Sequence, residues 1–220
     1  HIKIKELMKT RIFNLIILDE SGSMQSIKQA AINGMNETVQ SIRDAQNKHE
    51  DQEHIVSLIS FNSSQIKGIY NCVPAAEVKE LTDDDYCPSC CTPLYDAMGC
   101  AINELRPKVG SEDKVLVTVI TDGEENSSSE YDGKAIKALV EELKSKGWVF
   151  AYIGANQDVE KVAATISVTN VMNFAATDHG TRGMLFSLRK SRDRMFSRIA
   201  DGLFDACAEN ETFFENEDNE

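Results

Sequence analysis

Apolar residues in this chain gather into short runs that predict β-strands. The run at residues 12–18 is continuous rather than alternating, which is typical of a strand buried on both faces of a parallel sheet. A second run of this kind covers residues 115–121. The other predicted strands cover residues 54–61, 65–72, 148–153 and 168–174. The strand at 65–72 follows a short polar turn, so we expect it to pair as an antiparallel edge strand.

Between the strands, apolar residues recur every three or four positions, which predicts amphipathic helices. The first helix is expected after Ser23, with an apolar stripe through Ile27, Met35 and Ile42 and a charged turn at residues 43–53. The remaining helices are predicted at residues 94–105, 131–146, 158–165 and 181–207.

Strands that alternate with helices predict right-handed crossovers, and therefore an α/β fold in which a mostly parallel sheet carries helices on both faces. The elements run from residue 10 to residue 206 without a linker, which indicates one domain. Residues 207–220 are rich in Glu and Asp, and we expect them to form an acidic, disordered tail.

Oxygen-bearing side chains follow directly where the first buried strand stops. Asp19, Ser21 and Ser23 lie two residues apart, so one tight loop can direct all three toward the same place. Hard oxygen ligands at the carboxyl end of a central strand suit a cation such as Mg²⁺. The alternative is a helix cap, in which Ser23 is the N-cap of the following helix.

Two later residues extend this pattern. Thr92 precedes a predicted helix, and Asp122 follows the second buried strand. Each has a purely structural alternative, because Thr92 followed by Pro93 is a favourable helix start and Asp122 followed by Gly123 is typical of a turn.

Taken together, Asp19-x-Ser21-x-Ser23, Thr92 and Asp122 resemble the metal-ion-dependent adhesion site of von Willebrand factor type A (vWA) domains. The resemblance covers about residues 10–206. It implies a Rossmann-like, doubly wound and mostly parallel six-stranded sheet with one antiparallel edge strand and helices on both faces. The strands that end in Asp19 and Asp122 would then be neighbours at its centre. Family members often carry glycines before the matching threonine, where this chain has Cys90-Cys91.

The resemblance also implies a ligand set and a partner. The hydroxyls of Ser21, Ser23 and Thr92 would bind Mg²⁺ or Mn²⁺ directly, and the two aspartates would often act through water. Neutral hydroxyls leave the ion electrophilic, and one position stays open for an outside ligand. The expected partner is a protein that presents an Asp or Glu side chain.

Three further acidic residues, Glu20, Glu124 and Glu125, flank these loops. They are expected either to tune the affinity of the site for cations and acidic ligands, or to be ordinary solvated loop charges.

The composition excludes some classes of function. A formal net charge of −13 argues against nucleic acid, because a phosphate backbone requires a basic face. No apolar run approaches the ~20 residues that a transmembrane helix requires, so we expect no membrane span.

The cysteines leave several interpretations open. Cys87, Cys90 and Cys91 lie close together with CxxC spacing, but a second CxxC and a histidine pair are missing from the sequence. Zinc ligands, a disulfide and free thiols are all considered, and free thiols are favoured. Six cysteines without a visible signal peptide fit a reducing compartment, so we expect a cytoplasmic protein.

An enzyme is the main alternative to a binding module. Phosphatases of the haloacid dehalogenase type use Asp-x-Asp, but Ser21 occupies the second position here. The four histidines, His1, His49, His54 and His179, lie outside the candidate loops, and a phosphate-binding Gly-rich loop is missing from the sequence. We therefore expect no catalytic activity. An accessory subunit of a partner ATPase remains a third possibility.

Overall fold

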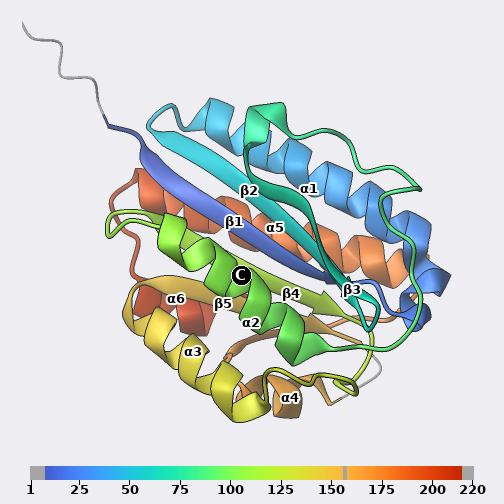
Figure 1. The fold of residues 1–220 in the computed structure, drawn as a ribbon. Helices are drawn as coiled ribbons and strands as arrows, with labels where there is room; N and C mark the ends of the chain where they lie inside the picture. Colours follow the sequence, from blue (N-terminus) through green and yellow to red (C-terminus); the bar gives the residue numbers. More distant parts are fainter. Residues whose placement is uncertain (1–7, 156–157, 215–220) are drawn as a thin grey trace, which may run out of the picture.

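A six-stranded sheet runs through the middle of the computed structural model, which describes residues 8–155 and 158–214 (Figure 1). The strands are β1 (Thr10–Asp19), β2 (Gln52–Asn62), β3 (Gln65–Pro74), β4 (Lys114–Thr121), β5 (Trp148–Gly154) and β6 (Asn170–Asn173). Their order is β3-β2-β1-β4-β5-β6. Only β3 is antiparallel to its neighbour, which confirms the predicted fold class and its antiparallel edge strand.

Helices cover both faces of this sheet. They are α1 (Lys28–Lys48), α2 (Leu94–Leu105), α3 (Gly133–Ser145), α4 (Val159–Thr165), α5 (Asp178–Ala200) and α6 (Ala206–Thr212), with short 3-10 turns η1 (Gly22–Ile27), η2 (Ala75–Glu77) and η3 (Arg106–Lys108). Within the described residues, none of the helices has the length and apolar character needed to cross a membrane.

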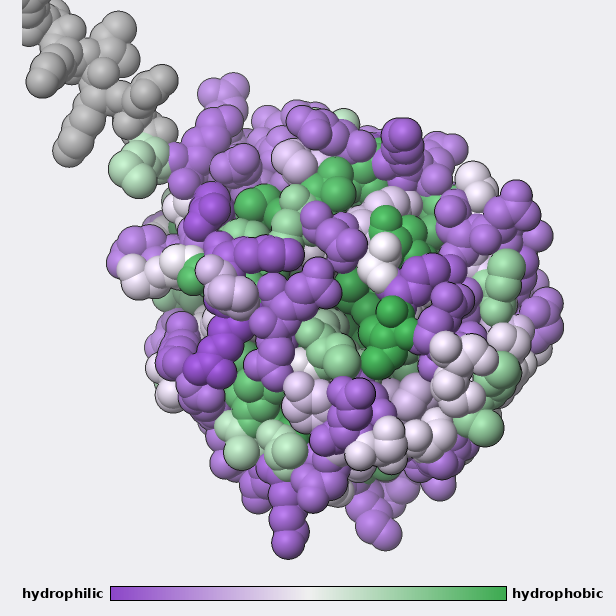
Figure 2. Space-filling view, viewed as in Figure 1, coloured by the Kyte–Doolittle hydropathy of each residue, from purple (hydrophilic) through white to green (hydrophobic). Residues whose placement is uncertain are grey.

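Alternate residues of each central strand face two separate hydrophobic cores. In β1, Ile16 and Leu18 pack with α1 and α5, whereas Leu15 and Ile17 pack with α2, α3 and α4. Burial on both faces explains why β1 and β4 are continuous apolar runs. The outer surface seen in Figure 2 is mostly hydrophilic, with apolar residues visible in the middle of the face.

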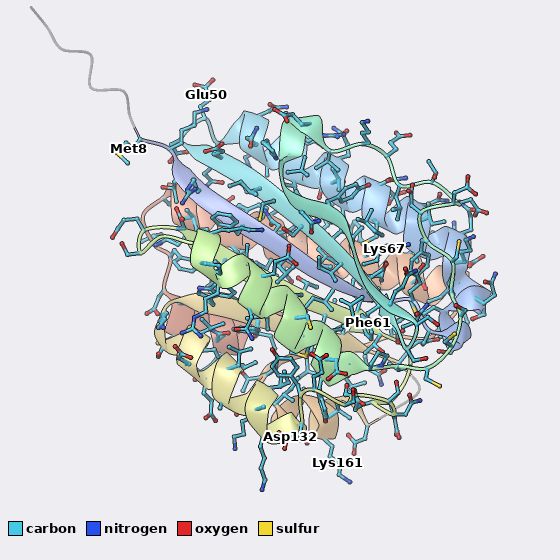
Figure 3. The ribbon with its side chains drawn as sticks, in the orientation of Figure 1. Met8, Glu50, Phe61, Lys67, Asp132 and Lys161 are labelled. Carbon is cyan, nitrogen blue, oxygen red and sulfur yellow. The ribbon has the colours of Figure 1, made fainter. Side chains whose placement is uncertain are left out.

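The register of the central strands brings their carboxyl ends together. Leu18 of β1 lies beside Ile120 of β4, and Asp19 lies beside Phe61 of β2. In Figure 3, Phe61 and Lys67 mark this end of the sheet, far from Met8 and Glu50. The loops after β1 and β4 therefore meet at one edge, as predicted.

Several element boundaries differ from the prediction. The segment after Ser23 begins as the 3-10 turn η1, and α1 then continues to Lys48 instead of ending near Ile42. The charged end of α1 stays helical because it packs against the rest of the domain. Ala45 is buried there, and Arg43 donates to the backbone oxygen of Ala75. Strand β6 is only four residues long.

The structure differs from the predicted closing helix at residues 181–207 and from the predicted disordered tail at residues 207–220. Helix α5 ends at Ala200, and Gly202 follows with a φ of 69°. A separate helix, α6, then occupies part of the segment predicted to be disordered. Asn210 anchors it, since its side chain accepts a hydrogen bond from the Phe150 backbone N–H (3.0 Å) and donates to the Trp148 carbonyl (2.8 Å). Residues 215–220 of the predicted tail lie outside the described residues.

Candidate metal centre

Asp19 ends β1 with a buried and oriented carboxylate. Its Oδ1 accepts a hydrogen bond from the Ser21 backbone N–H (2.7 Å), and its Oδ2 accepts one from the Thr121 hydroxyl (2.6 Å). The Asp19 side chain is fully shielded from solvent. Asp19 therefore binds its own loop and the end of β4, and it does not cap the helix that follows.

The loop after β1 and the loop after β4 meet through hydroxyl contacts. Ser23 Oγ donates to Asp122 Oδ1 (2.5 Å), and Ser21 Oγ lies 3.2 Å from Ser23 Oγ. Asp122 is buried with only 2% of its surface exposed, whereas Ser23 is exposed. Three of the predicted ligands therefore form one continuous chain of oxygen contacts.

Thr92 reaches the same place from the start of α2. A Cβ built on Gly123 would lie 3.4 Å from Thr92 Oγ1 and 3.7 Å from Ser23 Oγ, so both hydroxyls face the turn that follows Asp122. The missing side chain at Gly123 leaves room beside the two hydroxyls. The structure thus brings together all five residues that the sequence singled out.

Neither Ser23 nor Thr92 acts as a helix cap. Helix α2 begins one residue later than a Thr92 cap requires, with Pro93 at the N-cap position and no side-chain capping bond among the described residues. The first N–H groups of α2 bind instead to side chains of the loop after β4. Glu125 accepts from Tyr95 N (3.0 Å), and Ser128 Oγ accepts from Asp96 N (3.1 Å). The turn η1 likewise shows no side-chain cap. The structural alternatives for these two hydroxyls are therefore wrong.

The electrostatics of the site favour a cation. Burial raises the pKa of the Asp19 carboxyl, although its hydrogen bonds from Thr121 and Ser21 act against this, and the charge of Asp122 raises it further. Burial also raises the pKa of Asp122. Two carboxylates that are costly to ionise without a counter-ion are stabilised when a positive charge lies between them.

The donor set suits a hard cation rather than zinc. It consists of two carboxylates and three hydroxyls, and within the described residues there is no cluster of three or more His, Cys, Asp and Glu side chains arranged for a metal. Oxygen-only sets of this kind fit Mg²⁺ or Mn²⁺. The residues present therefore fit the ion that the sequence resemblance implies.

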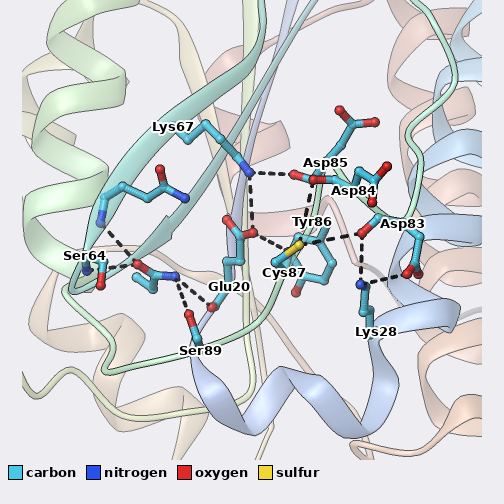
Figure 4. A network of polar contacts seen from close by, with 12 residues as sticks. Glu20, Lys28, Ser64, Lys67, Asp83, Asp84, Asp85, Tyr86, Cys87 and Ser89 are labelled. Atoms are coloured by element: carbon cyan, nitrogen blue, oxygen red, sulfur yellow. Dashed lines mark hydrogen bonds and ion pairs between the residues drawn. The ribbon is translucent and has the colours of Figure 1, made fainter.

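Glu20 is not a solvated loop charge. Its side chain is buried, its Oε1 accepts from the Cys87 backbone N–H (2.5 Å), and the Lys67 ammonium lies 3.5 Å away (Figure 4). Lys67 also donates to the Asp85 carbonyl (2.6 Å). The Glu20 carboxylate thus holds the loop before α2 against the end of β1, and this loop carries Tyr86, whose hydroxyl donates to the Asp19 carbonyl (2.5 Å).

Glu125 is likewise structural, and only Glu124 is an exposed charge. Besides Tyr95 N, the Glu125 carboxylate accepts from the backbone N–H groups of Ser127 (2.9 Å) and Ser128 (2.7 Å). Glu124 lies on the surface. Glu20 and Glu125 are therefore not ordinary solvated loop charges, and the expectation that the three residues tune the affinity of the site stays a prediction.

Two supporting residues were not identified from the sequence. Asp96, in the first turn of α2, accepts hydrogen bonds from the backbone N–H groups of Ser129, Glu130 and Tyr131 at 2.8 to 2.9 Å. These bonds lower the pKa of Asp96, although burial opposes them. Asn126 pairs with the backbone of Thr92. The available signal was weak, because Asp96 is a single acidic residue among apolar neighbours and Asn126 is one of many polar residues in the run that follows Asp122.

The cysteines are free in this structure. Cys87 Sγ points toward the carbonyls of Asp83 and Asp84, whereas Cys90 Sγ contacts the Ser64 hydroxyl at 3.2 Å. Cys90 adopts a φ of 64°, and its carbonyl accepts the Gly22 N–H at 3.0 Å. The residues that replace the usual glycines therefore still form a tight loop against the candidate site.

The sheet order and its helices define a vWA-like α/β fold. No protein-family model and no curated protein matches the chain. Among solved structures, proximal thread matrix protein 1 (PTMP1) from the mussel byssus is similar, with a TM-score of 0.61 and 16% identity over 83% of this chain. The D319A mutant of the PilB minor pilin from Streptococcus sanguinis has a TM-score of 0.58 and 14% identity over 86% of this chain.

The SpRpn10 VWA domain is similar over nearly its whole length. Its TM-score is 0.54 at 9% identity, and the match covers 81% of this chain and 94% of that domain. By contrast, the chain spans 46% of the mussel protein and 63% of the pilin. At these identities the likeness establishes the fold alone.

Proposed function

We propose that this chain is a non-catalytic protein-interaction module that binds a partner through Mg²⁺ or Mn²⁺. Asp19, Ser21, Ser23, Thr92 and Asp122 would hold the ion, and an Asp or Glu side chain of the partner would complete its coordination. The observation that carries the proposal is the meeting of Ser23, Thr92 and Asp122 beside Gly123, with neither hydroxyl used as a helix cap.

The residues of the proposed site would have different roles. Ser21, Ser23 and Thr92 supply neutral oxygens, while the Asp19 carboxylate is held in place by the Ser21 N–H and the Thr121 hydroxyl. When bound, the ion would supply a positive centre that attracts a carboxylate. Since the hydroxyls proposed to contact the ion directly carry no charge, an anionic partner group would be held by a strong charge-assisted contact.

The acidic surroundings would limit which partners bind. With Glu20 and Glu125 engaged in the loops, Glu124 is the exposed one of the three acidic residues that flank the site. The net charge of −13 repels strongly acidic proteins at long range. A protruding carboxylate among neutral or basic residues is therefore the expected partner feature. Six free cysteines support a reducing compartment, and we propose the cytoplasm.

Calorimetric titration of MgCl₂ and MnCl₂ tests the metal site directly. Asp122→Asn should abolish measurable binding, and Ser23→Ala should weaken it by about tenfold, the cost of roughly one polar ligand contact. Ser26→Ala provides the matched control, because Ser26 is an exposed serine of the same turn that lies outside the five residues. If Ser23→Ala and Ser26→Ala bind Mg²⁺ like the unaltered chain, the assignment is incorrect.

The partner is then sought by pull-down in MgCl₂ and in EDTA. A protein retained by the chain in MgCl₂ but lost in EDTA, and lost again with Asp122→Asn, is the expected result. Replacing its contacting Asp or Glu by the amide should abolish binding. A partner that binds equally in EDTA and MgCl₂ would contradict the proposal, even if the metal itself binds.

A further inference from the structure

The CxxC pair, Cys87 and Cys90, lies beside the candidate metal site but supplies none of the proposed ligands. Both thiols are free and both residues are exposed, as is the neighbouring Cys91. Pro88 and Ser89 separate the pair, and cysteines with this spacing form reversible disulfides in redox-active proteins. Exposed thiols with a second thiol close by are typical of redox-sensitive sites. The pair is therefore a candidate for reversible oxidation.

The backbone of the CxxC segment is bonded to the loop that follows β1. The Cys87 N–H donates to Glu20 Oε1 (2.5 Å), and the Cys90 carbonyl accepts a hydrogen bond from the Gly22 N–H (3.0 Å). Between them, the Ser89 N–H donates to the Glu20 carbonyl (2.9 Å). A Cβ built on Gly22 would lie 3.6 Å from the Cys90 carbonyl oxygen, so the two segments are in close contact. Gly22 itself stands between two of the proposed ligands.

The two thiols of the pair face different parts of the molecule. Cys87 Sγ lies 3.7 Å from the Asp83 carbonyl, whereas Cys90 Sγ lies 3.2 Å from the Ser64 hydroxyl. In Figure 4, Cys87 and Ser64 are seen on opposite sides of Glu20. A disulfide holds its two sulfur atoms ~2 Å apart, so the segment has to move before the bond can form. The segment that moves is the one bonded to the loop after β1.

We propose that Cys87 and Cys90 form a reversible disulfide that weakens the candidate metal site. The proposal rests on the function proposed above, because it concerns the regulation of the same site. Closing the bond would draw the Cys90 carbonyl away from Gly22 and the Cys87 N–H away from Glu20, so the loop that carries Ser21 and Ser23 would lose its support. Disulfides in cytoplasmic proteins are usually transient and redox-sensing, which agrees with the proposed compartment.

The oxidant is a low-molecular-weight disulfide, RSSR. One thiol of the pair attacks it, which forms a mixed disulfide, breaks the S–S bond of RSSR and releases the first RSH with the thiol proton. The second thiol then attacks the protein sulfur of the mixed disulfide, which closes the Cys87–Cys90 bond and releases the second RSH. Two thiols are thereby oxidised and one RSSR is reduced to two RSH. Excess RSH reverses the reaction.

The first experiment measures the disulfide in EDTA, without any metal. The chain is equilibrated with mixtures of reduced and oxidised glutathione, and cysteines are alkylated with different reagents before and after reduction. Fragment mass spectra then assign the label on each cysteine. We expect Cys87 and Cys90 to become protected together, while Cys91 stays free. A chain in which this pair does not close in excess oxidised glutathione, or in which Cys91 takes the place of either partner, would overturn the proposal.

The second experiment compares Mg²⁺ binding by the reduced and oxidised chains in calorimetry. The oxidised chain should bind about tenfold more weakly or worse, and dithiothreitol should restore the affinity. Cys87→Ser keeps the backbone N–H that binds Glu20, so it should bind Mg²⁺ like the reduced chain and should not respond to oxidation. Cys91→Ser, the matched control, should still lose affinity when oxidised. By reciprocity, MgCl₂ should favour the reduced pair in the glutathione mixtures by the same factor.

The results separate this proposal from the proposed function. If the reduced chain binds no Mg²⁺, both are wrong. If the reduced chain binds Mg²⁺ and the chain with a closed Cys87–Cys90 bond binds it equally well, only the redox proposal is overturned. An equal loss of affinity in oxidised Cys87→Ser would assign the effect to another thiol and would overturn it too. Circular dichroism of the oxidised chain should match that of the reduced chain, since a chain unfolded by the bond would contradict a local effect on the site.

Discussion

Asn126 holds the backbone of Thr92 through two hydrogen bonds. The Thr92 N–H donates to Asn126 Oδ1 (2.9 Å), and the Asn126 N–H donates to the Thr92 carbonyl (3.2 Å). The loop that follows Asp122 therefore fixes the position of a hydroxyl contributed by the start of α2. Thr92 and Asp122 are distant in sequence, and these two hydrogen bonds fix the position of one relative to the other.

Asn126→Ala should weaken Mg²⁺ binding although it removes no proposed ligand. Loss of the Oδ1 acceptor frees the Thr92 N–H, and we expect a reduction in affinity of about fivefold, corresponding to ~1 kcal/mol for one hydrogen bond. Asn126→Asp keeps an acceptor oxygen at this position and should restore positioning. Calorimetry measures both variants, with Asn103→Ala as a control for an exposed asparagine on α2. Unchanged affinity in Asn126→Ala would show that Thr92 needs no such support.

Asp19→Asn should have opposite effects with and without metal. Burial raises the pKa of Asp19 above its ordinary value of 3.8, so the folded state binds its proton more tightly than the unfolded state. The cost of ionisation is therefore complete above the raised pKa, and it disappears as the pH falls below the ordinary value. At neutral pH in EDTA, Asp19→Asn should be more stable than the unaltered chain by about 1 kcal/mol.

The same variant should gain no stability from MgCl₂, whereas the unaltered chain should. Urea unfolding in EDTA and in MgCl₂, repeated near pH 4 and at pH 7, measures both effects. The advantage of Asp19→Asn in EDTA should shrink at the lower pH. An advantage that is independent of pH would show that the buried charge is not its cause.

Glu20→Ala should destabilise the fold more than Glu20→Gln does. The alanine leaves the Cys87 N–H and the Lys67 ammonium without their common acceptor, Glu20 Oε1, at a cost of roughly 2–3 kcal/mol. Glutamine retains an oxygen acceptor for Cys87, and its amide can occupy the place of Oε2, which has no hydrogen-bond partner among the described residues. Glu124→Ala, an exposed neighbour of the same site, is the control. Equal stability of all three variants in urea would reject the structural role of Glu20.

The sequence was sufficient for the parts of the molecule that depend on local patterns. Strands β1 and β4 were predictable because burial on both faces requires a continuous apolar run. The five candidate ligands followed from polar residues placed where such strands or helices begin and end. Glu20, Asp96 and Asn126 could not be assigned, because their roles arise from contacts between loops that are 30 or more residues apart in sequence. Charge alone could not distinguish a buried loop anchor from a solvated side chain.

Helix α6 was not predicted, because the acidic composition of residues 207–220 is typical of a disordered tail. Asp205 caps α6 by accepting the Cys207 N–H (2.9 Å). Glu209 is only 2% exposed, and its carboxylate pairs with Arg198 at 2.8 Å. The usable signal was Phe213-Phe214, since two adjacent aromatic residues are out of place in a solvated tail. Phe213 is fully buried in the core formed with α1 and α5.

Asn210→Ala should therefore destabilise the whole domain, rather than only its last helix. The alanine removes the acceptor of the Phe150 N–H and the donor to the Trp148 carbonyl, which leaves two buried polar groups of β5 unsatisfied. Each such group costs about 1–3 kcal/mol, so the free energy of unfolding should fall by roughly 2–6 kcal/mol in a single transition. Glu211→Ala, an exposed residue of the same helix, should have little effect. Urea unfolding followed by the fluorescence of Trp148 reports on β5 directly. If Asn210→Ala and Glu211→Ala unfold at the same urea concentration as the unaltered chain, α6 adds nothing to the stability of the sheet and behaves as the tail that its composition suggests.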